Sequence, residues 1–229
     1  MTIGRFPDRP CKPPAIGPLW RHNQAAGAIV RQAATTFLED DQRRLKQPRI
    51  APLKDEEMDA DQREILGERF KTGKVFNIFR TLSKSPKAYK GFMRWGGYIL
   101  SDYNDLSPRD RELVILRAGF NWKSGYEWAQ HVRIGKQCGL TDEEVERIKA
   151  GPDADGWSAL DAAMLQATDE LTSDAFITDA TWARLSELSE KQKMDLVMTV
   201  GQYTQVSMML NSFGIQLDDD LTLDPDLAK

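Results

Sequence analysis

One stretch of this 229-residue sequence concentrates the residue types that move protons. Glu127 and His131 are four residues apart, and in a helix this spacing places two side chains on one face within contact distance. Imidazole titrates near neutral pH, and a neighbouring carboxylate orients the ring and raises its basicity. Glu112 reaches the same pocket if its helix forms a hairpin with the next one. Two carboxylates and one imidazole make a general acid/base set.

Neighbouring side chains are candidates for binding a substrate. Arg117 and Arg133 can hold a carboxylate through paired hydrogen bonds, although the spacing of Arg117 from Glu112 favours a salt bridge elsewhere. In the final helix, Gln202 and Tyr203 can line a pocket. Further aromatic side chains can exclude water, and a serine hydroxyl can donate to a substrate oxygen. These remaining candidates are Trp122, Ser124, Tyr126 and Trp128.

Each of these patterns also has a purely structural interpretation. A Glu/His pair at this spacing is commonly a hydrogen-bonded pair on a helix surface. Aromatic side chains more often pack in a core, where a tyrosine hydroxyl finds a hydrogen-bonding partner. An isolated histidine such as His22 is seldom catalytic. The chemical interpretation therefore needs support beyond spacing.

The elements that must position these residues are all predicted to be helices. Ser85 and Ser107 are each followed by proline, the combination typical of a helix start. Thr141 and Glu144 form a capping box, and Gly151 suits the end of that helix. No Val/Ile-rich segment alternates with period two, so the fold class is all-α. The expected helices are 23–46, 58–70, 85–101, 107–120, 124–139, 141–151, 157–171, 178–189 and 189–214, the last as the central buried helix.

Composition excludes several functional classes. Hydrophobic residues make up 41% and charged residues 29%, and the net charge of −4 argues weakly against nucleic acid as a partner. No apolar run reaches the roughly 18–20 residues that span a membrane, and no signal peptide is evident, so a cytoplasmic location is expected. Two histidines, no phosphate-binding glycine motif and two isolated cysteines, Cys11 and Cys138, predict no metal, no cofactor and no disulfide.

The ends of the chain differ from its middle. Residues 5–18 are rich in proline, which favours an extended arm that either wraps a neighbouring subunit or stays mobile. We therefore expect an arm and first helix over 1–50, a helical domain over 51–217 and an acidic tail over 218–229 that frays.

The segment RELVILRAGFNWKSGYEWAQHVRIGKQCGLTDEEVERIKAG resembles the carboxymuconolactone decarboxylase / alkylhydroperoxidase D-like family. The resemblance covers roughly 80–217 and includes the downstream run VGQYTQVSMMLNSFGIQLD, while the first 50 residues are not covered. It implies an alkylhydroperoxidase D-like helical bundle with an N-terminal extension. It also implies a homo-oligomer, trimeric or hexameric, with a dimer still open.

The redox branch of that family carries a glutamate, then a CxxC pair, then a histidine. Laid over this sequence, the glutamate falls on Glu112 and the histidine on His131, but the cysteine positions fall on Ser124 and Glu127. A disulfide-cycling peroxidase needs a thiolate and a resolving thiol, and Cys138 has no partner at that spacing. Thiol peroxidase chemistry is therefore not expected.

The decarboxylase branch is similar in that it lacks the cysteine pair and carries a glutamate four residues before the histidine, as Glu127 and His131 stand here. This branch implies a cofactor-independent carbon–carbon lyase of aromatic-compound degradation that acts on a small carboxylated or lactone-type acid. His131 would donate or shuttle the proton, Glu127 would orient and tune it, and Glu112 would be a second acid/base or fix the site. An isomerase or another lyase using the same residues, and a non-catalytic oligomeric protein, remain alternatives.

Overall fold

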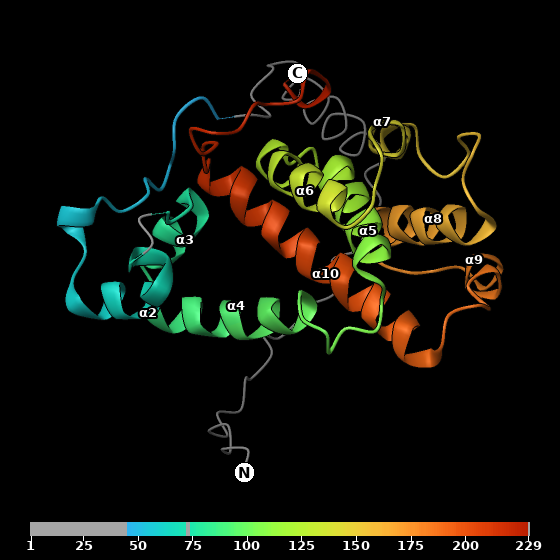
Figure 1. The fold of residues 1–229 in the computed structure, drawn as a ribbon, viewed down its shortest axis with the longest axis horizontal. Coiled ribbons are helices and arrows are strands. Elements are labelled where there is room, and N and C mark those ends of the chain that lie inside the picture. The colour runs from blue at the N-terminus through green and yellow to red at the C-terminus, as the bar shows by residue number, and fades with distance from the viewer. Residues whose placement is uncertain (1–44, 72–73, 229) are drawn as a thin grey trace, which may run out of the picture. The chain divides into compact units, whose positions relative to one another are not determined.

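The structure is a computed structural model that describes residues 45–71 and 74–228, without the side chains of residues 68 and 70 (Figure 1). In these ranges the regular elements are nine α-helices and two 3-10 turns with no strand, which confirms the all-α prediction. The elements are η1 (Asp55–Glu57), α2 (Ala60–Lys71), α3 (Asn77–Leu82), α4 (Pro86–Ile99), α5 (Pro108–Asn121), α6 (Gly125–Gln137), α7 (Asp142–Ala150), α8 (Ala159–Asp174), α9 (Asp179–Arg184), α10 (Glu190–Phe213) and η2 (Pro225–Leu227). The expected N-terminal arm, His22, Cys11 and most of the expected helix over 23–46 lie outside the described residues. The two described residues of that expected helix, 45 and 46, are not helical.

Caps were predicted at three helix starts, and two of them form the expected hydrogen bonds. The side-chain oxygen of Ser107 accepts the backbone N–H three residues later and opens α5. Thr141 and Glu144 form the reciprocal capping box of α7, which ends at Gly151 with φ of 98°. Ser85 occupies the N-cap position of α4 as predicted, but its side chain makes no cap hydrogen bond. The proline that follows Ser85 sets the start of α4 instead.

The core is built around α5, which packs against α6, α7, α8 and α10. Residues 113–116 are completely buried, because this helix is covered on every side. In Figure 1, α10 crosses the described region diagonally, with α4 along one side and α5 and α6 on the other. The expectation of a central buried α10 holds only in part, since Met194 and Met208 on its outer face are exposed. No helix among the described residues is both long and apolar enough to cross a membrane.

The segment before α4 contains an element that the sequence patterns did not predict. α3 has only six residues, too few for a helical period to be visible. It packs against α4, as α2 does. Inside α2 the backbone turns at Gly67, whose φ of 51° and ψ of −126° are not helical. This turn changes the direction of the chain for the last residues of α2, which include Arg69.

The acidic segment after α10 does not fray, contrary to expectation. Asp218 accepts a hydrogen bond from the hydroxyl of Tyr126 at 2.5 Å, and Asp224 accepts one from the indole of Trp128 at 3.2 Å. Leu227, within η2, is only 1% exposed. Specific hydrogen bonds and a buried leucine therefore hold this segment against α6 through residue 228.

Candidate active site

His131 lies between two carboxylates. Its Nδ1 atom is 2.7 Å from Oε2 of Glu112, and its Nε2 atom is 2.9 Å from Oε1 of Glu127. Glu112 comes from α5, whereas Glu127 and His131 come from one face of α6. All three residues are buried, with exposed fractions of 1%, 4% and 7% in chain order. The predicted hairpin of α5 and α6 therefore brings the three residues together.

Two glycines let α5 and α6 approach closely enough for this arrangement. A Cβ atom on Gly119 would lie 3.3 Å from Cγ of Glu127. A Cβ atom on Gly135 would lie 2.9 Å from Cδ1 of Leu140 and 3.6 Å from Cβ of Glu112. Larger side chains at either position would push the helices apart. The short interhelical distance, set by residues that bear no chemistry, thus positions both carboxylates.

The charge state of His131 follows from its two neighbours. Burial alone lowers the pKa of the imidazole, but the negative charges of Glu127 and then Glu112 outweigh it and raise the pKa to about 10. At neutral pH the ring is therefore an imidazolium that carries both N–H protons. Such a group acts as a proton donor rather than as a base.

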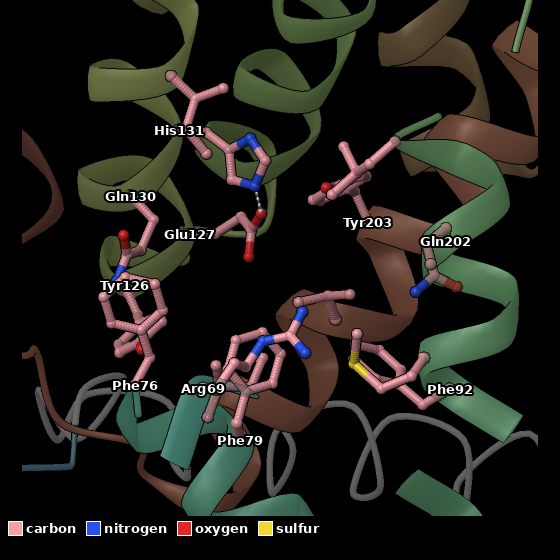
Figure 2. A pocket seen from close by; sticks show the side chains of 17 residues that line it. Arg69, Phe76, Phe79, Phe92, Tyr126, Glu127, Gln130, His131, Gln202 and Tyr203 are labelled. Carbon is pink, nitrogen blue, oxygen red and sulfur yellow. Dashed lines mark ion pairs between the residues drawn. The ribbon is translucent and has the colours of Figure 1, made fainter. Parts of the chain in front are cut away.

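Glu127 and His131 face a cavity of about 420 Å³, a volume suited to a small organic ligand. Glu112 does not line the cavity, because it lies on the far side of the imidazole. Figure 2 shows the Glu127 carboxylate pointing into the cavity below His131, with Arg69 reaching in from the opposite side. The cavity is lined by Arg69, Phe76, Ile78, Phe79, Phe92, Met93, Gly96, Gly97, Leu100, Tyr126, Glu127, Gln130, His131, Ile134, Gln202, Tyr203 and Val206.

Tyr203 stands in the cavity wall beside His131, as the sequence suggested. The two rings meet edge to face, with 4.9 Å between their centroids and 81° between their planes. Burial, followed by the charges of Glu127 and Glu112, raises the pKa of the Tyr203 hydroxyl well above its usual value of 10. The phenol therefore stays protonated and can donate a hydrogen bond to a ligand oxygen.

The remaining predicted residues of α6 and its N-cap divide between cavity and core. Tyr126 lines the cavity, but its hydroxyl donates to Asp218. Trp128 is buried in the core and donates its indole N–H to Asp224, so its predicted contact with substrate is wrong. Ser124 is also outside the cavity lining and completely buried, and its hydroxyl has no hydrogen-bonding partner among the described residues.

Three further candidates lie outside the cavity lining. Trp122 donates its indole N–H to Thr204 on the outer side of α10. Arg117 donates two hydrogen bonds of 2.6 and 2.8 Å to Asp169. This is the kind of salt bridge that the spacing of Arg117 from Glu112 favoured. Arg133 donates to Asp220 and to Gln130, so a substrate carboxylate is bound by neither arginine. Both guanidinium groups are already neutralised by carboxylates of the chain itself.

Arg69, whose side chain lines the cavity with a positive charge, was not predicted from the sequence. Arg69 lies after the turn at Gly67, and its guanidinium carbon is 4.6 Å from the ring centroid of Phe79. No sequence pattern links α2 and α3 to the acid/base set, since only tertiary packing closes the cavity with them. Gln202, which the sequence did suggest, lines the cavity from α10.

The described residues offer little to thiol or metal chemistry. They contain no group of three or more His, Cys, Asp and Glu side chains placed to hold a metal ion. Cys138 lies at the end of α6 as a free thiol. Its pKa is raised by burial and by the charge of Glu112, which disfavours the thiolate.

Comparison with known proteins confirms the predicted resemblance. Residues 86–170 match the model of the carboxymuconolactone decarboxylase family, a range that contains Glu112, Glu127 and His131. No match was found among curated proteins.

Solved structures share the fold. The alkylhydroperoxidase AhpD core of a peroxidase-related protein from Ralstonia eutropha JMP134 is 19% identical, with a TM-score of 0.63 over 75% of this chain and 94% of that one. A peroxidase-related protein from Silicibacter sp. TM1040 is 17% identical, with a TM-score of 0.62 over 79% and 94%. The debrominase Bmp8, as a variant in complex with 2,3,4-tribromopyrrole, is 15% identical, with a TM-score of 0.62 over 76% and 94%. The described helices thus form an alkylhydroperoxidase D-like bundle.

Proposed function

We propose that this chain is a cofactor-independent acid/base enzyme that decarboxylates a small unsaturated acid of the carboxylated-lactone type, and the match of residues 86–170 to the model of the carboxymuconolactone decarboxylase family supports the proposal. The observation that carries the proposal is the imidazolium of His131. It is held between Glu112 and Glu127 at the wall of a largely apolar cavity. A proton donor that is charged at neutral pH and lies beside apolar space suits a reaction that ends with protonation of carbon.

The proposed reaction balances without a cofactor. The bond between the ring carbon and the carboxylate breaks, its electron pair moves into the conjugated lactone carbonyl, and CO₂ leaves. The resulting enolate collapses as its carbon takes the proton from Nε2 of His131, the ring nitrogen that lies 2.9 Å from Oε1 of the cavity-lining Glu127. Solvent then returns one proton to His131. Glu112 keeps the ring oriented throughout by its contact with Nδ1, and its negative charge favours the return of a proton to the ring.

Two groups support the charge that develops on the carbonyl oxygen. The protonated hydroxyl of Tyr203 is one donor beside His131. The amide of Gln202, one residue earlier in α10, is the second. The apolar side chains of the cavity exclude water, which strengthens both hydrogen bonds.

The guanidinium of Arg69 supplies the binding charge. It enters the cavity opposite Glu127, and its guanidinium carbon lies 4.6 Å from the ring centroid of Phe79 in a cation–π contact (Figure 2). We assign it to an anionic group of the substrate, which it would bind through paired hydrogen bonds.

The test is turnover of 4-carboxymuconolactone, followed by mass spectrometry. We expect the wild-type protein to release CO₂, and His131→Ala to lower turnover at least about 100-fold while keeping its helical circular dichroism. Glu143→Gln, an exposed change on α7, serves as the control with unchanged turnover. Near-normal turnover in His131→Ala would contradict the assignment.

The product distinguishes the proposal from its closest alternative. An isomerase would use the same proton donor, but its product would have the mass of the substrate. A non-catalytic protein of the same fold would convert none of the carboxylated lactones offered. Recovery of the isomer, or of unchanged substrate alone, would overturn the decarboxylase proposal.

We further propose that the chain assembles with copies of itself through the outer face of α10. An exposed stripe recurs there every three to four residues and contains no charged side chain: Met194, Val197, Gly201, Gln205 and Met208. Uncharged apolar surface of this kind is self-complementary across a symmetry axis. Light scattering should report an oligomer, and Met208→Glu should shift it towards the monomer. A monomeric wild-type protein would refute this part of the proposal.

A further inference from the structure

The wall of the cavity formed by α4 lacks side chains over part of its length. Gly96 and Gly97 are adjacent in α4, and both line the cavity that Glu127 and His131 face. Successive glycines inside a helix weaken it, because they gain the most backbone freedom on unfolding. The local stability of α4 therefore does not account for this pair.

The space in front of these glycines is open. A Cβ atom on Gly97 would meet no described atom within 4 Å. A Cβ atom on Gly96 would meet only Nε2 of Gln202, at 3.7 Å. Neighbouring side chains thus leave the backbone of Gly96 and Gly97 uncovered where they line the cavity, with Gly97 exposed and Gly96 half-buried, and the space in front of them is available to a ligand.

From this uncovered backbone we infer that the ligand places a planar ring against Gly96 and Gly97, and that Gly97 sets the largest ring the site accepts. The inference deepens the proposed function, because it names the shape of the molecule that the acid/base residues would act on.

The other walls of the cavity agree with a planar anionic ring. Phe76, Phe79 and Phe92 supply aromatic surface around the space in front of α4 (Figure 2). Arg69 supplies a positive charge for a carboxylate at the edge of that space. A volume of about 420 Å³ has room for a ring with its substituents.

Gln202 provides a polar group in the part of the cavity next to Gly96. Its side chain is buried, and its Oε1 atom has no hydrogen-bonding partner among the described residues. The amide group stands beside Gly96. Buried amides normally find partners, so a polar substituent on the ring is the natural partner for this one.

The test compares two glycines of the same helix. Gly97→Leu fills the open space in front of α4, whereas Gly91→Leu adds the same side chain where a Cβ atom also meets nothing within 4 Å. Gly91 lines a separate groove between α4 and α10, so the pair separates occupation of the cavity from effects on the helix. Benzoate is the probe for binding, measured by calorimetry, and 4-carboxymuconolactone is the probe for turnover.

We expect wild-type protein and Gly91→Leu to bind benzoate alike, and Gly97→Leu to lose at least about tenfold in affinity and about 10–200-fold in kcat/KM. Melting temperatures of both leucine variants should not fall, because each replaces a helical glycine. If Gly97→Leu does not fold, Gly97→Ala replaces it in the comparison. We then expect smaller losses of benzoate affinity and of kcat/KM.

The outcomes separate this inference from the proposed function. Benzoate binding by Gly97→Leu at wild-type affinity, or no benzoate binding by the wild type, overturns the inference. The expected binding pattern without any release of CO₂ from 4-carboxymuconolactone upholds the inference and counts against the decarboxylase proposal alone.

Discussion

The ring of Tyr203 meets the imidazole of His131 edge to face, with 4.9 Å between the two ring centroids. This contact joins α10 to α6 at the wall of the cavity. It places a neutral phenol beside a charged imidazolium, since the pKa values of both groups are raised. One group can therefore give a proton while the other gives only a hydrogen bond.

Replacing Tyr203 by phenylalanine tests that division of roles. Tyr203→Phe keeps the ring packing and removes only the hydroxyl, so kcat should fall on the order of 10²-fold while KM changes little. Tyr98→Phe is the matched control, because its hydroxyl binds Asp195 outside the cavity lining. Equal kinetics of Tyr203→Phe and wild type would show that the hydroxyl stabilises no charge in the reaction.

Glu112→Gln should change the pH dependence of turnover. The substitution removes one of the two negative charges that raise the pKa of His131, so that pKa should fall. The alkaline limb of kcat/KM should then move to lower pH, and turnover at neutral pH should fall on the order of 10²-fold. A pH–rate profile between pH 6 and 10 measures both effects. An alkaline limb that stays in place would contradict the role given to Glu112.

Folding stability should decline in the alkaline range. The pKa of His131 is about 10 in the folded protein, against about 6.5 for an unperturbed imidazole in the unfolded chain. The stabilisation from its two carboxylates is therefore fully present below about pH 6.5 and is lost as the pH rises through 10. Urea unfolding at pH 6.5, 8 and 10 should show that the stability advantage of wild type over His131→Gln shrinks. A constant difference would mean that His131 does not titrate in this window.

Arg69→Gln should weaken binding more than chemistry. A charge-assisted hydrogen bond contributes about 1.5–3 kcal/mol, so KM should rise about 10–100-fold while kcat falls less. Arg69→Lys should recover part of the affinity through its positive charge. Arg94→Gln removes an exposed charge from α4 outside the cavity lining and is the control. A fall in kcat at unchanged KM would place Arg69 in the chemical step instead.

Leu227→Ala should destabilise the fold although it lies near the C-terminal end. The side chain is 1% exposed and belongs to the main hydrophobic core, so the free energy of unfolding should fall by about 2–5 kcal/mol. Phe176→Ala, at a largely exposed position, should change it by less than about 0.5 kcal/mol. Urea denaturation measures both. A small effect at Leu227 would indicate that residues 218–228 contribute little to the core.

Short-range sequence patterns predicted individual helices and the contact between Glu127 and His131 within α6. Thr141 and Glu144 cap α7 as expected, because a capping box needs only residues three apart. Glu127 contacts His131 because helical spacing alone brings them together. The contact of Glu112 with His131 depended in addition on a hairpin, which the short turn between α5 and α6 provides.

Patterns that needed a neighbouring element were less informative. α3 was missed because six residues show no period, and the acidic segment after α10 was expected to fray because its charges are paired only in the folded chain. Lys149, for example, lies 2.7 Å from Asp224. The sequence of a charged segment does not show whether the folded chain places oppositely charged side chains beside it.

The sequence by itself determined the helical class, most helix starts and the acid/base pair of α6, since each of these depends on residues a few positions apart. Only the tertiary structure decided which side chains share a cavity. Tertiary packing buries Trp128 in the core and pairs Arg117 with Asp169. It also makes Arg69 and Gly97 line the same cavity as His131. The physical reason is that helical periodicity defines the faces of one helix, whereas the partner of each face is set by packing among all of them.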